Sequence, residues 1–353
     1  MQAHSARVFV LAALLLSAIA LPVAAQAVAN DAAAKDATSP CASSIKSDFP
    51  KAVLSNGAVQ AVVYLPDAQK GYYRSTRFDW SGVVPCLTYK GHTYFGVWFN
   101  RYDPLLNDSI TGPVEEFRSS DGLSSINYEQ AKPGELFIKP GVGVLRRVDD
   151  SPYKFGFPYP IVDGGKWTVR VKKSEVTFTQ TLNSPLGFAY VYQKTLKLDK
   201  HQPVLILEHH MKNTGTKAID TEVYDHDFFM LDAAPTGPGM AVHFPFEPQA
   251  TRPMEPRAKI DGKDIVYLQE LGTGPRQSAT SYLTGFSSSP ADYDFTVENR
   301  NTGVGVEQTS NSSIAQLNFW SIRTTICPEA YIHLNVQPGQ TANWNIHYRF
   351  FAK

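Results

Sequence analysis

From about residue 50 to the end of the chain, apolar and polar residues alternate in short runs separated by clusters of Gly, Pro and Asn. A period of two is typical of a β-strand with one buried face. In residues 166–172, Trp167, Val169 and Val171 share one face and charged residues or Thr occupy the other, which predicts a half-buried strand. Similar runs occupy residues 174–182, 189–198, 203–212, 221–229 and 343–350. We therefore predict an all-β protein.

The connectors between these runs have the composition of turns. Residues 163–165, 213–215 and 338–340 combine Gly with Asp, Asn or Pro. No linker, charge block or repeat divides the chain after residue 48, and Pro and Gly are spread throughout. We expect residues 48–353 to form a single domain with a large antiparallel β-sandwich.

The N-terminal segment has a different composition. Residues 1–7 contain one Arg and no acid, an apolar run follows over 8–21, and Ala25-Gln26-Ala27 comes next. This pattern predicts a secretory signal peptide over residues 1–27 and a periplasmic or secreted protein with no membrane association after cleavage. Residues 28–47, rich in Ala, Asp, Ser and Lys, are predicted to be a flexible leader.

The charge balance and the cysteine count narrow the function classes. Lysines and arginines equal aspartates and glutamates at 33 each, which argues against a nucleic-acid partner. Three cysteines, Cys41, Cys86 and Cys327, allow at most one disulfide, and the pairing stays open. The sequence does not determine the oligomeric state.

Motif searches find no phosphate loop, dinucleotide fingerprint, G-x-S-x-G or H-E-x-x-H motif, so no cofactor is expected. No C-x-x-C spacing supports a zinc site. Glu208 and His210 fall on one face of a predicted strand, but two residues make a weak metal site. A metal-binding β-protein is therefore only a minor alternative, and no metal is predicted.

His226 is the first candidate for acid–base chemistry. Alternation puts it on one face with Tyr224 and Phe228, while Asp225 and Asp227 point the other way. A histidine between aromatic walls can bind the face of a sugar ring and donate a proton to it. An ordinary core histidine is the alternative.

Glu329 is the second candidate. It follows Pro328 and precedes the strand-like run 331–336, a position from which a carboxylate can project into a cleft. A solvated glutamate at a strand end is the alternative. A reaction that moves two protons needs such a pair of groups.

Most candidate ligand contacts lie in residues 72–80 and in residues 112–117 and 132–147, which mix charges with aromatic residues, and Tyr224 is a further candidate beside His226. Such side chains suit a hydroxyl-rich ligand, although a surface hairpin with scattered charges is an equal alternative. The candidates for substrate binding are Arg77, Asp79, Glu116, Lys139, Arg147 and Tyr224.

Three segments, 77–92, 213–229 and 327–344, follow one another in an order that resembles the galactose mutarotase (aldose 1-epimerase) superfamily. The resemblance implies a super-β-sandwich with a carbohydrate ligand in its concave face. It also implies that Glu329 acts as the base on the anomeric hydroxyl and His226 as the acid on the ring oxygen. For this chemistry the two groups must face one cleft, about one sugar ring apart.

The chain also departs from the family. Mutarotases usually carry a second active-site histidine in an H-G-G context, whereas His92 here follows Gly91. Asp225 and Asp227 stand where the family more often has neutral residues. The leading hypothesis is a secreted carbohydrate-binding protein with aldose 1-epimerase-like activity. The alternative is a carbohydrate-binding or lyase-like polysaccharide-processing protein on the same fold.

Overall fold

The computed structural model describes residues 41–274 and 276–353. All described residues belong to one compact unit. The predicted signal peptide and most of the predicted leader lie outside the described residues. In the described part, the only helices are three 3₁₀ turns, and no helix is long and apolar enough to cross a membrane. These turns are η2 (Ala42–Ser44), η3 (Leu231–Ala233) and η4 (Pro290–Asp292).

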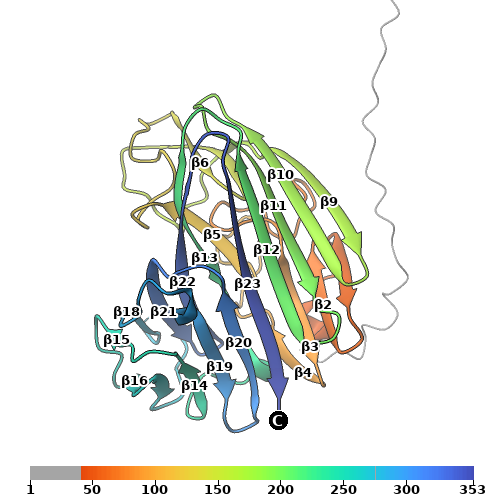
Figure 1. Cartoon of the computed structure of the whole chain (residues 1–353), viewed down its shortest axis with the longest axis vertical. Helices are drawn as coiled ribbons and strands as arrows, with labels where there is room; N and C mark the ends of the chain where they lie inside the picture. The colour runs from red at the N-terminus through yellow and green to blue at the C-terminus, as the bar shows by residue number, and fades with distance from the viewer. Residues whose placement is uncertain (1–40, 275) are drawn as a thin grey trace, which may run out of the picture. The chain divides into compact units, whose positions relative to one another are not determined.

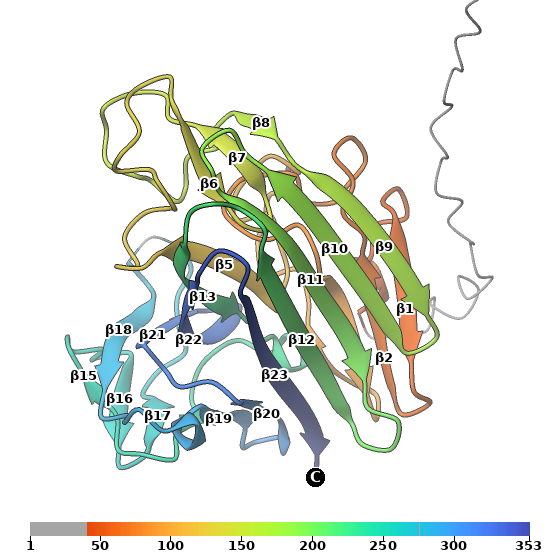
Figure 2. The same ribbon diagram turned by 45° about the horizontal axis from the view of Figure 1, so that its top comes forward.

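The largest element is a ten-stranded antiparallel sheet (Figures 1 and 2). Its strands, in spatial order, are β16 (Ala258–Asp261), β17 (Asp264–Tyr267), β14 (Met240–His243), β19 (Asp294–Asn299), β20 (Val304–Ser310), β23 (Thr341–Ala352), β12 (Val204–Asn213), β11 (Ala189–Leu198), β10 (Glu175–Asn183) and β9 (Lys166–Lys172). Buried and exposed positions alternate along β10 and β12, as expected for a sheet with one face packed on a core.

A six-stranded antiparallel sheet lies behind the ten-stranded sheet in Figure 1. Its strands are β15 (Gln249–Ala250), β18 (Ala279–Thr284), β21 (Gln316–Ile322), β22 (Thr325–Val336), β13 (Ile219–His226) and β5 (Val114–Ser119). Unlike the alternating strands of the first sheet, β13 and most of β22 are buried on both faces. Both faces of the sheet are therefore covered along β13 and most of β22.

Two smaller sheets complete the fold. One contains β1 (Lys51–Ser55), β2 (Val59–Tyr64), β3 (Val83–Tyr89) and β4 (His92–Phe95), and the other contains β6 (Leu136–Lys139), β7 (Gly143–Arg146) and β8 (Ile161–Asp163). Figure 2 shows β6, β7 and β8 near the end of the ten-stranded sheet at which the chain turns from β10 into β11. The first of these sheets packs on β23, where the rings of Tyr94 and Phe350 are 4.7 Å apart.

The predicted strands are confirmed, with ends that differ by up to three residues. Residues 166–172 and 189–198 form β9 and β11 with unchanged bounds. The half-burial predicted for β9 is wrong, because Val169 and Val171 are 37% and 47% exposed. β9 is the last strand of its sheet, so its inner face extends past the edge of the core.

Aromatic side chains hold the two large sheets face to face. The Phe117 ring on β5 lies 5.5 Å from Tyr192 on β11 and 6.3 Å from Trp344 on β23. All three side chains are buried in one continuous apolar cluster. Ring contacts of this kind add to the stabilisation from burial alone. The predicted antiparallel β-sandwich is thus confirmed.

The sandwich interior also contains ionisable side chains, which we call the core network: Asp79, Glu115, Lys194, His209, Asp225, Asp227 and Tyr348. Glu115 pairs with Lys194, and its Oε1 lies 2.6 Å from Nε2 of His209. The Lys194 ammonium and the imidazole lower the pKa of Glu115 despite its burial. A buried carboxylate needs such partners, because an unpaired charge in a dry interior is strongly unfavourable.

Two aspartates of the core network share one tyrosine. The Tyr348 hydroxyl lies 2.5 Å from Asp225 Oδ2 and 2.8 Å from Asp227 Oδ1. Because a hydroxyl donates only one hydrogen, the second contact requires a protonated aspartate as the donor. Burial raises the pKa of both carboxyls, which is consistent with this arrangement.

The N-terminal end of the described chain is fixed to the domain. Cys41 and Cys86 form a disulfide, and Cys327 is a buried free thiol. This resolves the pairing that the sequence left open. Cys41 belongs to the segment predicted to be a flexible leader, and its bond to β3 anchors the end of that segment.

Candidate active site

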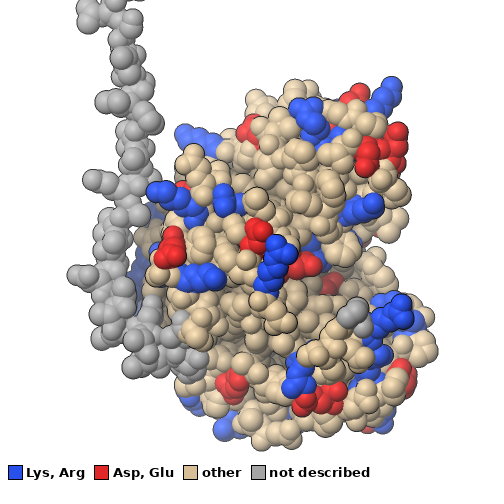
Figure 3. Space-filling model, turned by 180° about the vertical axis from the view of Figure 1, so that it is seen from behind, with Lys and Arg blue, Asp and Glu red and all other residues tan. Residues whose placement is uncertain are grey.

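His226 and Glu329 both project from the outer face of the six-stranded sheet. His226 is the last residue of β13, and Glu329 lies on the neighbouring β22. Tyr224 shares this face, whereas Asp225 turns inward to the core network, as alternation along the strand predicts. Figure 3 views the molecule from the side opposite to the ten-stranded sheet and shows acidic and basic side chains around a hollow.

The two candidate groups are in direct contact. His226 Nε2 lies 3.3 Å from Glu329 Oε1, and 5% of each side chain is exposed. The groups therefore face each other as the mechanism requires, but without the ring-sized space expected between them. A ligand reaches both groups only if their side chains move apart.

The site environment disfavours charge on both groups. Burial raises the pKa of Glu329 to about 7, although the Asn318 amide, which donates to Glu329 Oε2 at 2.9 Å, opposes this shift. Burial, followed by the nearby Arg77 guanidinium, holds the pKa of His226 well below its usual value. Near neutral pH the pair therefore holds at most one titratable proton, and that proton lies on Glu329 and leaves the imidazole neutral.

Aromatic rings fix the orientation of the imidazole. Phe228 stacks on His226 at 3.8 Å, and Phe78 and Trp320 meet it edge-on at 5.7 and 5.3 Å. Trp98 stacks on the other face of Phe228 at 4.8 Å. Phe228 has a φ of 49°, and its amide donates to the Cys327 thiol. The chain thus ends β13 in a tight turn that brings Phe228 back over His226.

Glu116 on β5 is the electrostatic centre of the same face. Its fully buried carboxylate accepts from Arg77, Arg118, Lys139 and the Tyr224 hydroxyl at 2.5–3.3 Å. These cations and the tyrosine outweigh the effect of burial and lower the pKa of Glu116 well below its usual value. The carboxylate therefore stays ionised and holds the basic side chains in place.

Two loops contact Arg77 at the border of the site. The guanidinium bonds Asp108 at 2.7 Å and lies 4.4 Å from the ring centroid of Phe155. The Asp108 side chain is 52% exposed and Phe155 is 47% exposed. The Asn107 side chain ties the loops together by donating to the Phe155 carbonyl at 2.7 Å.

The structure brings four of the six predicted contact residues to this face: Arg77, Glu116, Lys139 and Tyr224. Asp79 lies instead in the core network, where its carboxyl accepts from the Ser81 amide and hydroxyl. Arg147 is also away from the pair, and its guanidinium donates to backbone carbonyls such as those of Tyr128 and Ala131. These contacts make Asp79 and Arg147 part of the scaffold.

Sequence reasoning missed Asn318, Arg118 and Trp320. Asn318 is paired with Glu329 in the register of β21 and β22, and Trp320 lies two residues further along the same face. Arg118 follows Glu116 by two residues and therefore shares its face. Alternation within each strand shows which of these residues share a face. Only the pairing of β21 with β22 shows that the face of Asn318 and Trp320 is also that of Glu329.

The remaining histidines and acids do not extend the site. His92 lies 2.9 Å from Asp232 on η3, and the two side chains form a half-exposed pair. Within residues 41–274 and 276–353, no group of three or more His, Cys, Asp or Glu side chains is arranged to hold a metal ion. Glu208 and His210 lie on the outer face of the ten-stranded sheet.

Several solved structures share this fold at low sequence identity. The Slr1438 protein from Synechocystis sp. PCC 6803 is 14% identical with a TM-score of 0.53, over 88% of this chain and 99% of that chain. A galactose mutarotase related enzyme from Lactobacillus acidophilus is 10% identical with a TM-score of 0.51, over 85% and 97%. The GalM/aldose epimerase homologue from C. elegans is 13% identical with a TM-score of 0.52, over 86% and 99%.

These similarities establish the fold, which is that of the galactose mutarotase-like β-sandwiches, as the sequence resemblance predicted. No protein-family model and no curated protein matches the sequence.

Proposed function

We propose that this protein binds a sugar on the outer face of the six-stranded sheet and interconverts its anomers by acid–base catalysis at His226 and Glu329. The observation that carries the proposal is the 3.3 Å approach of the two groups on one sheet face, with the pKa of Glu329 raised to about 7. A group that titrates near neutral pH can both donate and accept a proton at little cost.

In this proposal one proton is shared between the two groups. Ring opening begins when one group takes the proton of the anomeric hydroxyl and the other gives its proton to the ring oxygen. The C1–O5 bond breaks and the C1=O1 double bond forms. After rotation about C1–C2, the reverse transfers close the ring as the other anomer and restore both groups.

With the proton on Glu329 and a neutral imidazole, Glu329 acts as the acid on the ring oxygen and His226 as the base on the anomeric hydroxyl during ring opening. This is the reverse of the roles implied by the family resemblance, because burial disfavours a carboxylate and an imidazolium together. Since the closing step exchanges the two roles, the overall reaction needs the same pair in either case.

A sugar must separate the two side chains to enter. Arg77 and Asn318 then remain as hydrogen-bond donors around it, and Trp320 offers an aromatic ring to the C–H face of a pyranose. Movement of the loops that carry Asp108 and Phe155 would widen the entrance.

The test is mutarotation of freshly dissolved aldohexoses, followed by polarimetry or by NMR anomer exchange. We expect Glu329→Gln and His226→Asn to lower the catalysed rate by about 10²–10⁴-fold each. A matched control is His333→Asn, because His333 lies on the same strand as Glu329 in an exposed pair with Asp220 at 2.7 Å. Unchanged exchange with measurable glycan binding would instead indicate a binding module without epimerase activity.

A further inference from the structure

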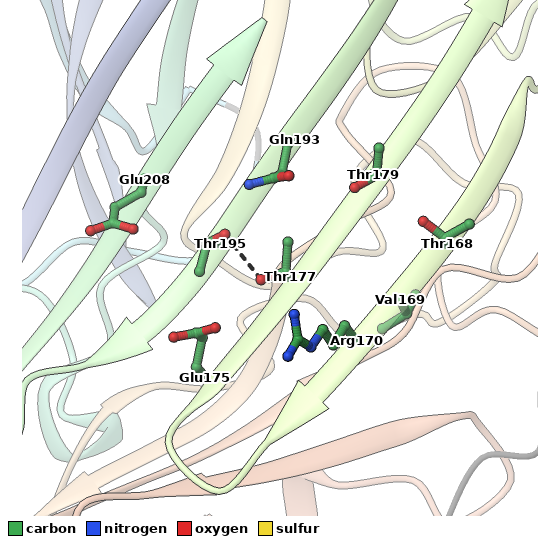
Figure 4. A pocket seen from close by; sticks show the side chains of 9 residues that line it. All are labelled: Thr168, Val169, Arg170, Glu175, Thr177, Thr179, Gln193, Thr195 and Glu208. Atoms are coloured by element: carbon green, nitrogen blue, oxygen red, sulfur yellow. Dashed lines mark hydrogen bonds between the residues drawn. The ribbon is translucent and has the colours of Figure 1, made fainter.

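The outer face of the ten-stranded sheet carries two adjoining depressions, far in the fold from the His226–Glu329 face. The larger has a volume of about 500 Å³ and is formed by side chains of β9, β10, β11 and β12 (Figure 4). The smaller, of about 310 Å³, extends over β12 and β23 and shares Gln193, Thr195 and Glu208 with the first. Together they form one continuous trough across five strands, which we call the sheet trough.

Most side chains that line the sheet trough are neutral and polar. Thr168, Thr177, Thr179 and Thr195 supply hydroxyls, and Gln193 supplies an amide near the middle (Figure 4). The smaller depression adds the amides of Asn311, Asn343 and Asn345. Hydroxyl and amide groups each donate and accept hydrogen bonds, as sugar hydroxyls do.

The sheet trough has little net charge, because each of its two glutamates has a lysine beside it and Arg170 is the one cation among the side chains that line it in the described part of the chain. Glu175 pairs with Lys172 at 2.7 Å, and Glu208 lies 4.0 Å from Lys197. Nucleic acids and other polyanions require clustered cations, and an apolar ligand requires an apolar lining. Neither condition is met here. The lining instead suits a neutral, polyhydroxylated ligand.

Strand register gives the lining a regular spacing. Thr168, Thr179, Gln193, His210 and Asn343 occupy paired positions on five successive strands, and Arg170, Thr177, Thr195, Glu208 and Asn345 form a second row. Neighbouring strands are about 4.8 Å apart, so each row spans about 19 Å. One polar group therefore recurs at intervals comparable with the length of a sugar unit in an extended chain.

Two of the lining groups are available to a ligand, whereas four others bond one another. Thr177 and Thr195 bond each other at 3.2 Å, and His210 bonds Asn343 at 2.7 Å. Within the part of the chain that the structure describes, the Gln193 amide and the Thr179 hydroxyl make no hydrogen bond to protein. A ligand would replace only water at these two positions.

We infer that the sheet trough is a second carbohydrate site, which binds an extended neutral oligosaccharide across β9, β10, β11, β12 and β23. The inference does not require catalysis at His226 and Glu329, because the two faces belong to different sheets. Without an exposed aromatic platform in the lining, hydrogen bonds carry the interaction, so we expect binding that depends on chain length and is weak for a monosaccharide.

The test is titration of the whole protein with cellohexaose, maltohexaose and glucose, followed by ¹H–¹⁵N NMR and calorimetry. At least one hexasaccharide should bind and shift the amides of β10, β11 and β12, with glucose at least tenfold weaker. The double variant Gln193→Ala and Glu208→Ala should weaken hexasaccharide binding about tenfold, because it removes two exposed hydrogen-bonding groups. Glu307→Ala, on the same sheet but outside the sheet trough, should have no effect.

The two sites give different outcomes in this test. His226→Asn should leave hexasaccharide binding unchanged while it removes any mutarotation. The inference would be overturned if neither hexasaccharide bound at millimolar concentration, or if His226→Asn abolished binding and the Gln193 and Glu208 variant did not. An unchanged thermal unfolding midpoint in each variant would exclude loss of fold as the cause.

Discussion

The hydrogen bond from Asn318 to Glu329 offers a quantitative test of the site electrostatics. The Asn318 amide donates to Glu329 Oε2 at 2.9 Å and lowers the carboxyl pKa, which burial alone would raise further. Replacement of Asn318 by Leu, which has a similar volume, removes this donor and leaves the pocket dry. The carboxylate then loses stabilisation that the protonated acid does not need.

The size of the effect follows from the strength of the bond. A hydrogen bond to a charged group contributes about 1.5–3 kcal/mol. Since one pKa unit corresponds to about 1.4 kcal/mol, the pKa of Glu329 should rise from about 7 by roughly one to two units. In the proposed mechanism the pair must carry one proton, so the alkaline loss of mutarotation should move upward by the same amount.

The shift can be measured without any substrate, by following the glutamate side-chain carboxyl ¹³C resonances against pH. Gln316→Leu is a matched control, because Gln316 lies on the same face of β21 and is paired with Tyr331 instead of Glu329. An unchanged or lower pKa in Asn318→Leu, or an equal shift in Gln316→Leu, would refute the reasoning.

Three further predictions concern stability. Lys194→Met should lower the free energy of unfolding by about 3–5 kcal/mol in urea titrations, because it leaves Glu115 buried without its main partner; a loss below 1 kcal/mol would contradict this. Burial raises the pKa of the three aspartates of the core network, so the folded state holds protons that the unfolded state releases above about pH 4. His226 acts in the opposite direction, but three groups outweigh one, so the thermal unfolding midpoint should decrease as the pH is raised from about 5 to about 7. A midpoint that increases over this range would be inconsistent with buried acids. Reduction of Cys41–Cys86, which are 45 residues apart, should cost about 4 kcal/mol, measured by unfolding with and without reductant; equal stabilities would disprove the contribution.

The sequence determined the strands and their faces because side-chain direction in a strand alternates with a period of two. This local rule placed β9 and β11 correctly, put His226 on one face of β13 and turned Asp225 to the other. Residue type then identified His226 and Glu329 as an acid–base candidate pair.

The order of strands in each sheet and the burial of each side chain depend on tertiary contacts. The pairing of β21 with β22 brings Asn318 to Glu329, and Asp79 is buried in the core network, where it accepts from Ser81. Burial depends on contacts between residues far apart in the chain, and it sets the pKa of Glu329 near 7. The two residues of the pair could therefore be identified from the sequence. Their charge state and their exposure could not, because both depend on long-range packing that local alternation does not encode.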